Sequence, residues 1–99
     1  LEENPLAQID ENNYRLLATY PVDEFNEYFK TQIPVEEYDT VGGLVFGLFG
    51  RIPRSGGAIT YENLKFRVEK MNGARILNLH LTVISSVSNG NQEKAKEET

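Results

Sequence analysis

Residues 38–50 read YDTVGGLVFGLFG, and this glycine-rich apolar stretch restricts the fold more than any other part of the chain. It predicts a helix that is capped at its start by Thr40, or by Asp39 before it, and at its end by a left-handed Gly50. The apolar positions of this helix are Val41, Leu44, Val45, Leu48 and Phe49. Its interior glycines are Gly42, Gly43 and Gly47. Each of them costs about 1 kcal/mol of helix propensity relative to alanine, so we expect the helix backbone to pack closely on a sheet.

The same glycines do not predict a phosphate-binding loop or a membrane span. Gly42 and Gly47 have the Walker spacing, but Leu48 and Phe49 follow where that loop needs Lys and Ser or Thr. Gly43 and Gly47 match the dimer motif of membrane helices, but the apolar segment around them is half the roughly 20 residues that a span requires. Packing is therefore the function that we assign to these glycines.

Alternating apolar and polar residues after Pro53 predict strands. A first strand includes Ile59 and Tyr61, with a turn at Asn63, and Asn72-Gly73 is the strongest signal for a tight hairpin turn. The apolar positions before that turn are Leu64, Phe66 and Val68. The returning strand is expected to place Leu77, Leu79, Leu81 and Val83 on one face and Asn78, His80 and Thr82 on the other.

The first part of the chain predicts a hairpin followed by a helix. Residues 10–13 read DENN, a turn composition between Ile9 and Tyr14. Pro21 suits the first turn of a helix, and Pro34 is expected to end that segment. The apolar face of this helix is Val22, Phe25 and Phe29. The elements together predict an α+β domain, with an antiparallel sheet of four or five strands and two helices on one face.

The 99 residues correspond to one small domain. The first dozen residues have the composition of an incoming linker or an edge strand, and we assign residues 1–8 to the linker, residues 9–84 to the domain and residues 85–99 to a disordered tail. The chain has no cysteine, and its first ten residues lack the basic and apolar regions of a signal peptide. We therefore expect the chain by itself to be soluble.

Charge is unevenly distributed along the chain. The net charge of −5 argues against nucleic acid as the main partner, because phosphate binding needs a basic face. Residues 1–40 carry a net charge of −8, whereas residues 50–75 carry +4. This polarity fits docking to another domain or to a symmetry-related copy, and it also fits two solvated faces.

Two clusters are candidate ligand sites. Arg51 and Arg54 flank Gly56 and Gly57, whose N–H groups could face an anion, or the glycines could only form a tight connection with positive φ. The second cluster is Glu36, Glu37 and Asp39. Carboxylates in a loop suit Mg²⁺ or Ca²⁺, but the spacing is not that of an EF-hand, and helix capping with solvation is the alternative.

No catalytic group is indicated by the sequence. His80 is the only histidine, and no serine or carboxylate is placed beside it by sequence, so a catalytic triad cannot be derived. A histidine at the surface or in an interface is the simpler interpretation. We expect the chain not to be an enzyme.

Residues 18–81 resemble the transporter-associated domain of the CorC/HlyC family. The resemblance is carried by PVDEFNEYF (21–29), by YDTVGGLV (38–45) leading into GRIP (50–53) and Gly56 or Gly57, and by LKFRVEKMNGARI (64–76). Ala18 departs from the family, which often has glycine there. In this family the glycine motif is a packing element, in agreement with the assignment made above.

The resemblance implies a position within a larger protein. The family consists of C-terminal modules of bacterial membrane proteins described as magnesium and cobalt efflux proteins or haemolysin-related proteins. It implies transmembrane helices and a pair of CBS domains before this module, on the cytoplasmic side of the inner membrane, with residues 1–8 as the tether. The fold is similar to part of the flavin-binding domains of certain oxidases, but the chain has no flavin-specific residues, so FAD rests on fold analogy alone.

Two functions therefore remain open. The first is a non-catalytic regulatory or interaction domain that docks against the CBS domains or against a second copy in a homodimer. The second is a small-ligand module. It would bind an adenine nucleotide or FAD through Arg51, Arg54, Gly56 and Gly57, or a divalent cation through Glu36, Glu37 and Asp39.

Overall fold

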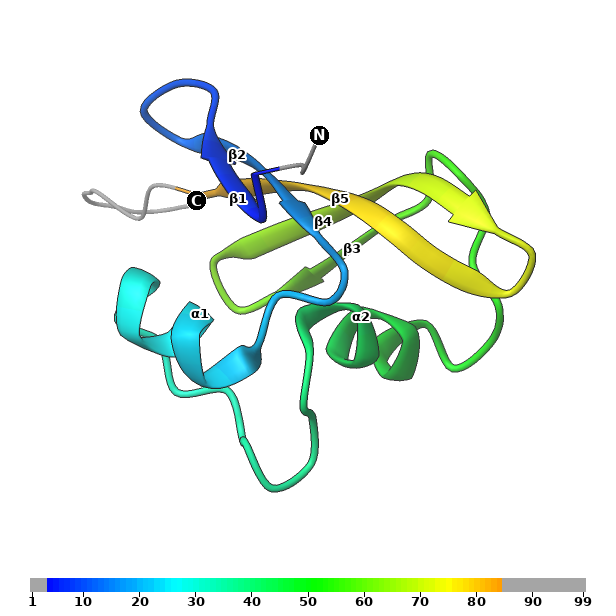
Figure 1. Cartoon of the computed structure of the whole chain (residues 1–99), viewed down its shortest axis with the longest axis horizontal. Coiled ribbons are helices and arrows are strands. Elements are labelled where there is room, and N and C mark those ends of the chain that lie inside the picture. Colours follow the sequence, from blue (N-terminus) through cyan, green and yellow to red (C-terminus); the bar gives the residue numbers. More distant parts are fainter. Residues whose placement is uncertain (1–3, 85–99) are drawn as a thin grey trace, which may run out of the picture.

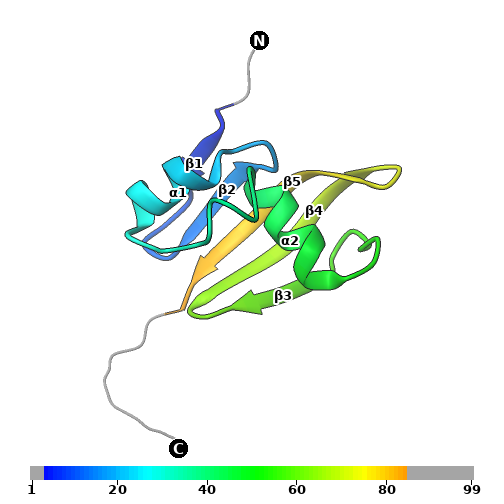
Figure 2. The ribbon, with the colours of Figure 1, turned by 90° about the horizontal axis from the view of Figure 1, so that it is seen from below.

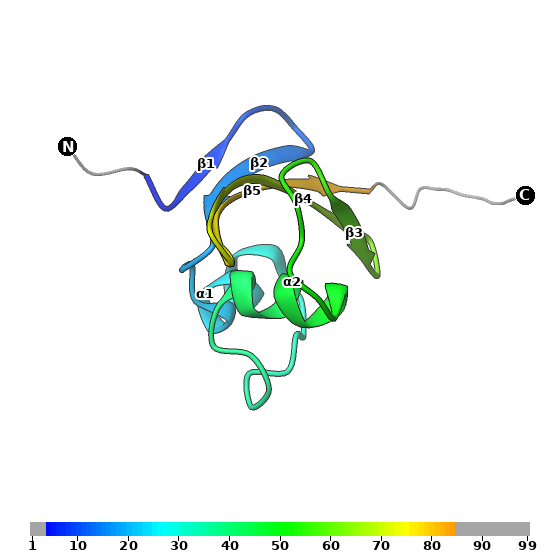
Figure 3. The ribbon, with the colours of Figure 1, turned by 90° about the vertical axis from the view of Figure 1, so that its right-hand side faces the viewer.

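The computed structural model describes residues 4–84, so the prediction for the 85–99 tail lies outside the described residues. The five strands form one antiparallel sheet in the order β1-β2-β5-β4-β3. Both helices lie on the same face of this curved sheet (Figures 1 and 3). The α+β architecture expected from the sequence is confirmed. The elements are β1 (Leu6–Gln8), β2 (Asn13–Leu17), α1 (Val22–Phe29), α2 (Val41–Phe49), β3 (Ala58–Tyr61), β4 (Leu64–Asn72) and β5 (Arg75–Val83).

The N-terminal hairpin has the turn that the sequence predicts. The carboxylate of Asp10 accepts hydrogen bonds from the backbone N–H groups of Asn12 and Asn13, at 2.9 and 3.0 Å. Such side-chain bonds to the following backbone are the reason why Asp and Asn favour turns. The assignment of residues 1–8 to a linker was wrong for Leu6–Gln8, which form the edge strand β1 and pair with β2. Only the residues before them remain as a predicted tether.

Helix α1 follows Pro21, which is its N-cap. The predicted apolar face packs inward, since Val22 and Phe25 are fully buried and Phe29 packs against the core. The prediction that Pro34 ends this segment was wrong for the helix. It ends at Phe29, because Lys30 takes the left-handed conformation (φ 58°) and its N–H bonds to the carbonyl of Asn26.

Helix α2 has both predicted caps. The side chain of Thr40 accepts a hydrogen bond from the N–H of Gly43 at 3.0 Å, and Gly50 is left-handed with φ 69°. Two backbone bonds tie the starts of the helices together: the N–H of Val22 donates to the carbonyl of Asp39, and that of Val41 to Tyr20. The Tyr38-to-Thr40 segment therefore sets the position of α2 beside α1.

Strands β4 and β5 form the long central hairpin. The two residues of its turn are Gly73 and Ala74, one position later than the predicted Asn72-Gly73 pair, because Asn72 pairs with Arg75. Only Gly73 has positive φ (61°), which is the pattern of a type II′ turn.

Register shifts in this hairpin change which β5 residue faces the core. They lie between Val68 and Met71 of β4. As a result Ile76, which is 6% exposed, faces the core. The prediction that Leu77 shares the inward face with Leu79 was wrong, because an irregular pairing adds a residue and reverses the alternation.

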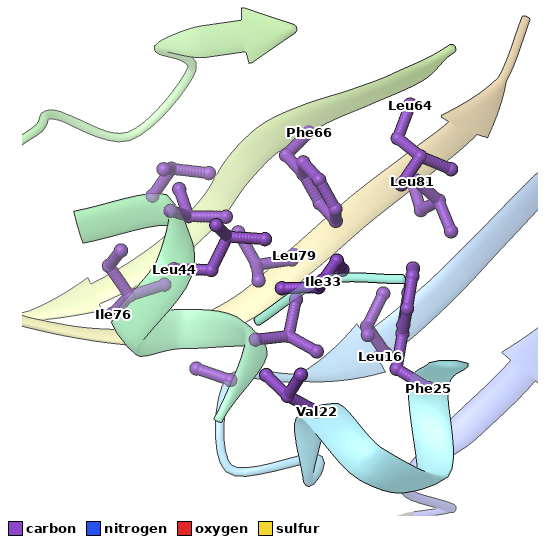
Figure 4. Close-up of a cluster of buried hydrophobic side chains, with 14 residues drawn as sticks. Leu16, Val22, Phe25, Ile33, Leu44, Leu64, Phe66, Ile76, Leu79 and Leu81 are labelled. Carbon is purple, nitrogen blue, oxygen red and sulfur yellow. The ribbon is translucent and has the colours of Figure 1, made fainter. Parts of the chain in front are cut away.

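The core lies between the sheet and the helices and draws on most elements (Figure 4). Strand β4 and strand β5 supply its floor, with Phe66, Leu79 and Leu81 fully buried. The helices close it from the other side through Phe25 and Leu44. Neither helix of the described region has the length and apolar composition required to cross a bilayer.

Candidate functional site

The glycine motif at the start of α2 is a packing contact. A Cβ placed on Gly42 would lie 2.6 Å from the Cβ of Ala18 and 2.9 Å from its carbonyl oxygen, so no side chain fits. The Gly42 N–H donates to that same oxygen at 2.8 Å. The N–H groups of Val41 and Gly43 are also bonded, to Tyr20 and Thr40. The helix start therefore offers no free N–H group in its first three residues to an anion.

Asn26, the asparagine of the PVDEFNEYF motif (21–29), holds the segment that follows α1. Its side-chain oxygen accepts bonds from the hydroxyl of Thr31 and the N–H of Ile33, at 2.8 and 2.9 Å. Its amide nitrogen donates to the Ile33 carbonyl at 2.9 Å. These three bonds fold the chain back after α1 and place Ile33 in the core, where it is 2% exposed. The motif residue is structural.

The Arg–Gly loop forms a β-bulge. The N–H of Gly56 donates to the carbonyl of Val68 at 2.7 Å, and the N–H of Val68 donates to Gly57 at 2.8 Å. With φ of 91° at Gly56, two residues oppose one in the arrangement of a G1 bulge. The Gly57 N–H donates to the carbonyl of Arg54. Both glycine N–H groups are thus used within the fold, which leaves only side chains for an anion.

The two arginines of this loop remain at the surface. Arg51 and Arg54 are exposed, and with Phe49 and Gly57 they line an open hollow beside the end of α2. No salt bridge of the described region involves either guanidinium group. The predicted cofactor-binding set therefore lies together, but as a shallow cationic surface without backbone donors.

The predicted metal ligands do not converge. Glu36, Glu37 and Asp39 are all exposed, and residues 4–84 contain no group of three or more His, Cys, Asp or Glu side chains that could hold a metal ion. The carbonyl of Asp39 instead accepts the Val22 bond that joins the helices.

A polar network on the outer face of the sheet was missed by sequence reasoning. The Nε2 of His80 lies 2.9 Å from Oδ1 of Asn13, and its Nδ1 lies 3.7 Å from the carboxylate of Glu69. Glu69 also pairs with Arg15 at 3.0 Å, and Thr82 donates to the same Asn13 oxygen. Only the strand register could have predicted this network. Strand β5 pairs with both β2 and β4, and this pairing brings together residues that are far apart in the sequence.

Asp10 extends this network and fixes its orientation. The Asn13 amide donates to the Asp10 carboxylate at 2.9 Å, so the other end of that amide must accept, and His80 therefore donates through Nε2. The pKa of Asp10 is lowered from its ordinary value, first by this side-chain bond and then by the Asn12 backbone N–H. The network is a set of satisfied polar groups, in which the Thr82 hydroxyl donates to the Asn13 amide and not to a base.

The charge asymmetry of the sequence becomes an asymmetry of faces. The outer face of the sheet carries the cations of β2 and β4, which are Arg15, Lys65, Arg67 and Lys70, against Glu69. Helix α1 and the segment that leads to α2 lie on the opposite side of the sheet (Figures 1 and 3), and their sequences contain exposed acids. These acids are Asp23, Glu24, Glu27, Glu36, Glu37 and Asp39.

The fold and these contacts define a small α+β domain whose motif residues hold the structure together. The chain belongs to the CorC_HlyC family, described as the transporter associated domain, whose model matches residues 7–85. The resemblance seen in the sequence is thus confirmed.

Similar proteins and structures agree with this assignment. The chain is 36% identical over 78 residues to the magnesium and cobalt efflux protein CorC of Pasteurella multocida, covering 79% of this chain and 26% of that protein. The chain therefore spans about a quarter of the length of the curated relatives it matches.

Two solved structures have the same fold. One is a Mg²⁺ and Co²⁺ transporter (CorC) associated region from Neisseria meningitidis, with 27% identity, a TM-score of 0.78, and coverage of 82% of this chain and 100% of that one. The other is a hemolysin domain from Enterococcus faecalis, with 31% identity, a TM-score of 0.75, and coverage of 83% and 100%.

Proposed function

We propose that this chain is a non-catalytic regulatory module of a bacterial cation-efflux or haemolysin-like membrane protein, and that it acts by docking against other domains of that protein. The observation that carries the proposal is the pair of oppositely charged faces, one on the sheet and one on the helical side. Complementary charge favours orientation and specificity at such contacts. The motif residues of the family hold the fold and leave these faces available.

The parent protein supplies the proposed partners. The relatives are magnesium and cobalt efflux proteins of about four times the matched length, which leaves room for a transmembrane region and a CBS domain pair. In this proposal the module lies on the cytoplasmic side of the inner membrane and biases the conformation of the transporter. The proposed module is non-catalytic, in keeping with the hydroxyl contacts of residues 4–84, none of which joins a hydroxyl to His80 or to a carboxylate.

Charge reversal in the full-length protein tests the docking. The double variant Lys65→Glu with Arg67→Glu inverts the outer sheet face, and we expect it to impair cation efflux without loss of protein from the membrane. Lys30→Glu changes charge in the same sense at an exposed position at the end of α1, away from that face, and is the control. If deletion of residues 10–84 left efflux, assembly and ligand response unchanged, the proposal would be wrong.

A small-ligand module is the second candidate, and the hollow lined by Arg51, Arg54 and Phe49 favours it. An amide NMR titration with Mg²⁺, then ATP, then FAD distinguishes the two functions. Saturating shifts confined to residues 36–39 or 51–57 would support a ligand sensor. Small shifts spread over all exposed charges would reflect screening alone and would favour protein contacts.

A further inference from the structure

The outer edge of β3 is an unprotected strand edge. In the sheet, β3 pairs only with β4, and no element of residues 4–84 lies beyond it (Figure 2). Its sequence, AITY, contains no charge and no proline, and β-branched and aromatic residues make up most of it. Edge strands normally carry charges, prolines or bulges that prevent pairing with another chain. Strand β3 has none of these within its four residues.

The pairing with β4 shows which backbone groups are free. The N–H of Val68 donates to the carbonyl of Gly57, the residue just before β3. Along an antiparallel ladder, residue pairs that exchange hydrogen bonds alternate with pairs that do not. The pair Ile59–Phe66 is therefore hydrogen-bonded, whereas Ala58 and Thr60 direct their N–H and C=O groups away from β4. Ala58 and Thr60 together therefore offer two N–H donors and two C=O acceptors at the outer edge of β3.

We propose that β3 pairs antiparallel with β3 of a second copy of this chain, across a two-fold axis at Ile59. In this register Ala58 of one copy lies opposite Thr60 of the other, and each such pair exchanges two backbone hydrogen bonds. The two Ile59 side chains, which are half-buried against the core, become neighbours on the helix side of a continuous sheet. The contact is closed and isologous, so it stops at a dimer.

Charge complementarity favours a second copy over an unrelated strand. Exposed cations, Arg51 and Arg54, precede β3, and an exposed acid, Glu62, follows it. Antiparallel pairing about a two-fold axis brings Glu62 of each copy to the Arg54 end of the other. A parallel arrangement would place like charges together, so the same residues also select the direction.

The other edge of the sheet is protected, which makes it the natural comparison. Strand β1 has three residues and follows Pro5, and the side chain of Gln8 bonds to the carbonyl of Asp10. Leu17 donates to Pro5 and Ile9 donates to Asn13, so by the same alternation Gln8 directs its N–H outward. A proline at Gln8 therefore removes an outward N–H from the edge that we do not propose as an interface.

Sedimentation equilibrium of this chain, over concentrations from about 10 μM to about 1 mM, tests the proposal. The contact is small, so we expect a weak dimer with a dissociation constant in the upper part of this range. Thr60→Pro removes an outward N–H and leaves every bond to β4 in place, and we expect it to weaken association at least tenfold. Gln8→Pro and Thr60→Ala are the controls and should associate like the parent chain.

Charge exchange provides a test that does not depend on proline. Glu62→Arg alone and Arg54→Glu alone should each weaken the dimer, and the double variant should restore it. A chain that stays monomeric over the whole range would overturn the proposal, as would equal association of Thr60→Pro and Gln8→Pro. If Thr60→Pro fails to fold by circular dichroism, failure of the double exchange to restore the dimer overturns it. The inference does not rest on the regulatory function, because these measurements use this chain alone.

Discussion

The contact between Gly42 and Ala18 decides how closely α2 approaches the sheet. In this chain the methyl group of Ala18 fills part of the space in front of Gly42. The sequence predicted close approach from the cost of helical glycines, but only the structure shows that Gly42 is the one that requires it. Gly43 is exposed and meets only the Thr40 hydroxyl, at 3.3 Å.

Gly42→Ala should therefore destabilise the fold. Alanine gains about 1 kcal/mol of helix propensity, but its methyl group would lie 2.6 Å from the Cβ and 2.9 Å from the carbonyl oxygen of Ala18, and overpacking costs about 1–3 kcal/mol. Since the gain offsets part of the cost, we expect a net loss of up to about 2 kcal/mol in the free energy of unfolding, measured by urea denaturation. Gly43→Ala is the control and should stay within about 1 kcal/mol of the parent. Equal stability of the two variants would contradict the packing assignment.

Asp10 gives a pH-dependent contribution of known sign. Its pKa is lowered in the fold, chiefly by the Asn13 amide, so it stabilises the protein above its ordinary pKa of 3.8. This stabilisation is lost as the pH falls through the lowered folded value. We expect Asp10→Asn to be less stable than the parent near pH 7, and the difference to shrink as the pH falls below 3.8 and through the lowered folded pKa, because the carboxyl group then becomes neutral. Urea denaturation at several pH values measures this, and a difference that does not shrink in acid would contradict it.

At the scale of elements, locally encoded features were predictable and paired features were not. The Thr40 cap and the left-handed Gly50 follow from residue type and position, so the sequence located α2 correctly. Lys30 is left-handed without the glycine that usually signals such a cap, so the end of α1 was misplaced. The inward position of Ile76 depends on the irregular pairing of β4 with β5, which no property of β5 alone reveals.

The candidate sites divide in the same way. The glycine pair was given two interpretations, and the bulge opposite Val68 decides that its N–H groups serve the fold. The outer-face network was not predicted, because Asn13 and His80 are 67 residues apart and meet only through the β2–β5 register. Long-range sheet pairing carries information that periodicity within one segment cannot provide.

Asn26 shows how one side chain shapes the connection after a helix. Asn26→Ala removes three hydrogen bonds and leaves the N–H and C=O of Ile33 without these partners. At about 1 kcal/mol for each bond, we expect a loss of about 2–4 kcal/mol in the free energy of unfolding. Thr31→Ala removes only the bond from the Thr31 hydroxyl, so its loss should be smaller. The two variants are compared by thermal or urea unfolding, and an equal loss would show that the two bonds to Ile33 contribute nothing.

For the whole molecule, the order of strands assigns charge to faces. Counting residues gives an acidic first part and a basic later part, but β2 from the first part lies beside β5 and places Arg15 near the cations of β4. The acids of α1 and of the segment after it stay on the helical side. Which face meets which partner thus depends on topology, and the sequence alone left docking and solvation equally open.

One core joins the helices to the sheet, so the described domain should unfold as a single cooperative unit. The cluster of fourteen buried residues includes side chains from both helices and from three of the five strands. Leu79 is fully buried on β5, between β2 and β4, so Leu79→Ala should lower the free energy of unfolding by about 2–5 kcal/mol. Far-ultraviolet circular dichroism and tyrosine fluorescence should report the same shifted midpoint.

Leu6→Ala on β1 is the matched control for this variant. Leu6 packs against the core but is only half-buried on an edge strand, so its truncation should cost clearly less than that of Leu79.

Amide exchange tests the alternative that the helices unfold separately from the sheet. If Leu79→Ala lowered protection in the sheet while the amides of α1 and α2 kept theirs, the helices would be a separate unit, and the single shared core would not govern stability. Because Phe25 of α1 and Phe66 of β4 lie with ring centroids 6.1 Å apart, we expect both regions to lose protection together.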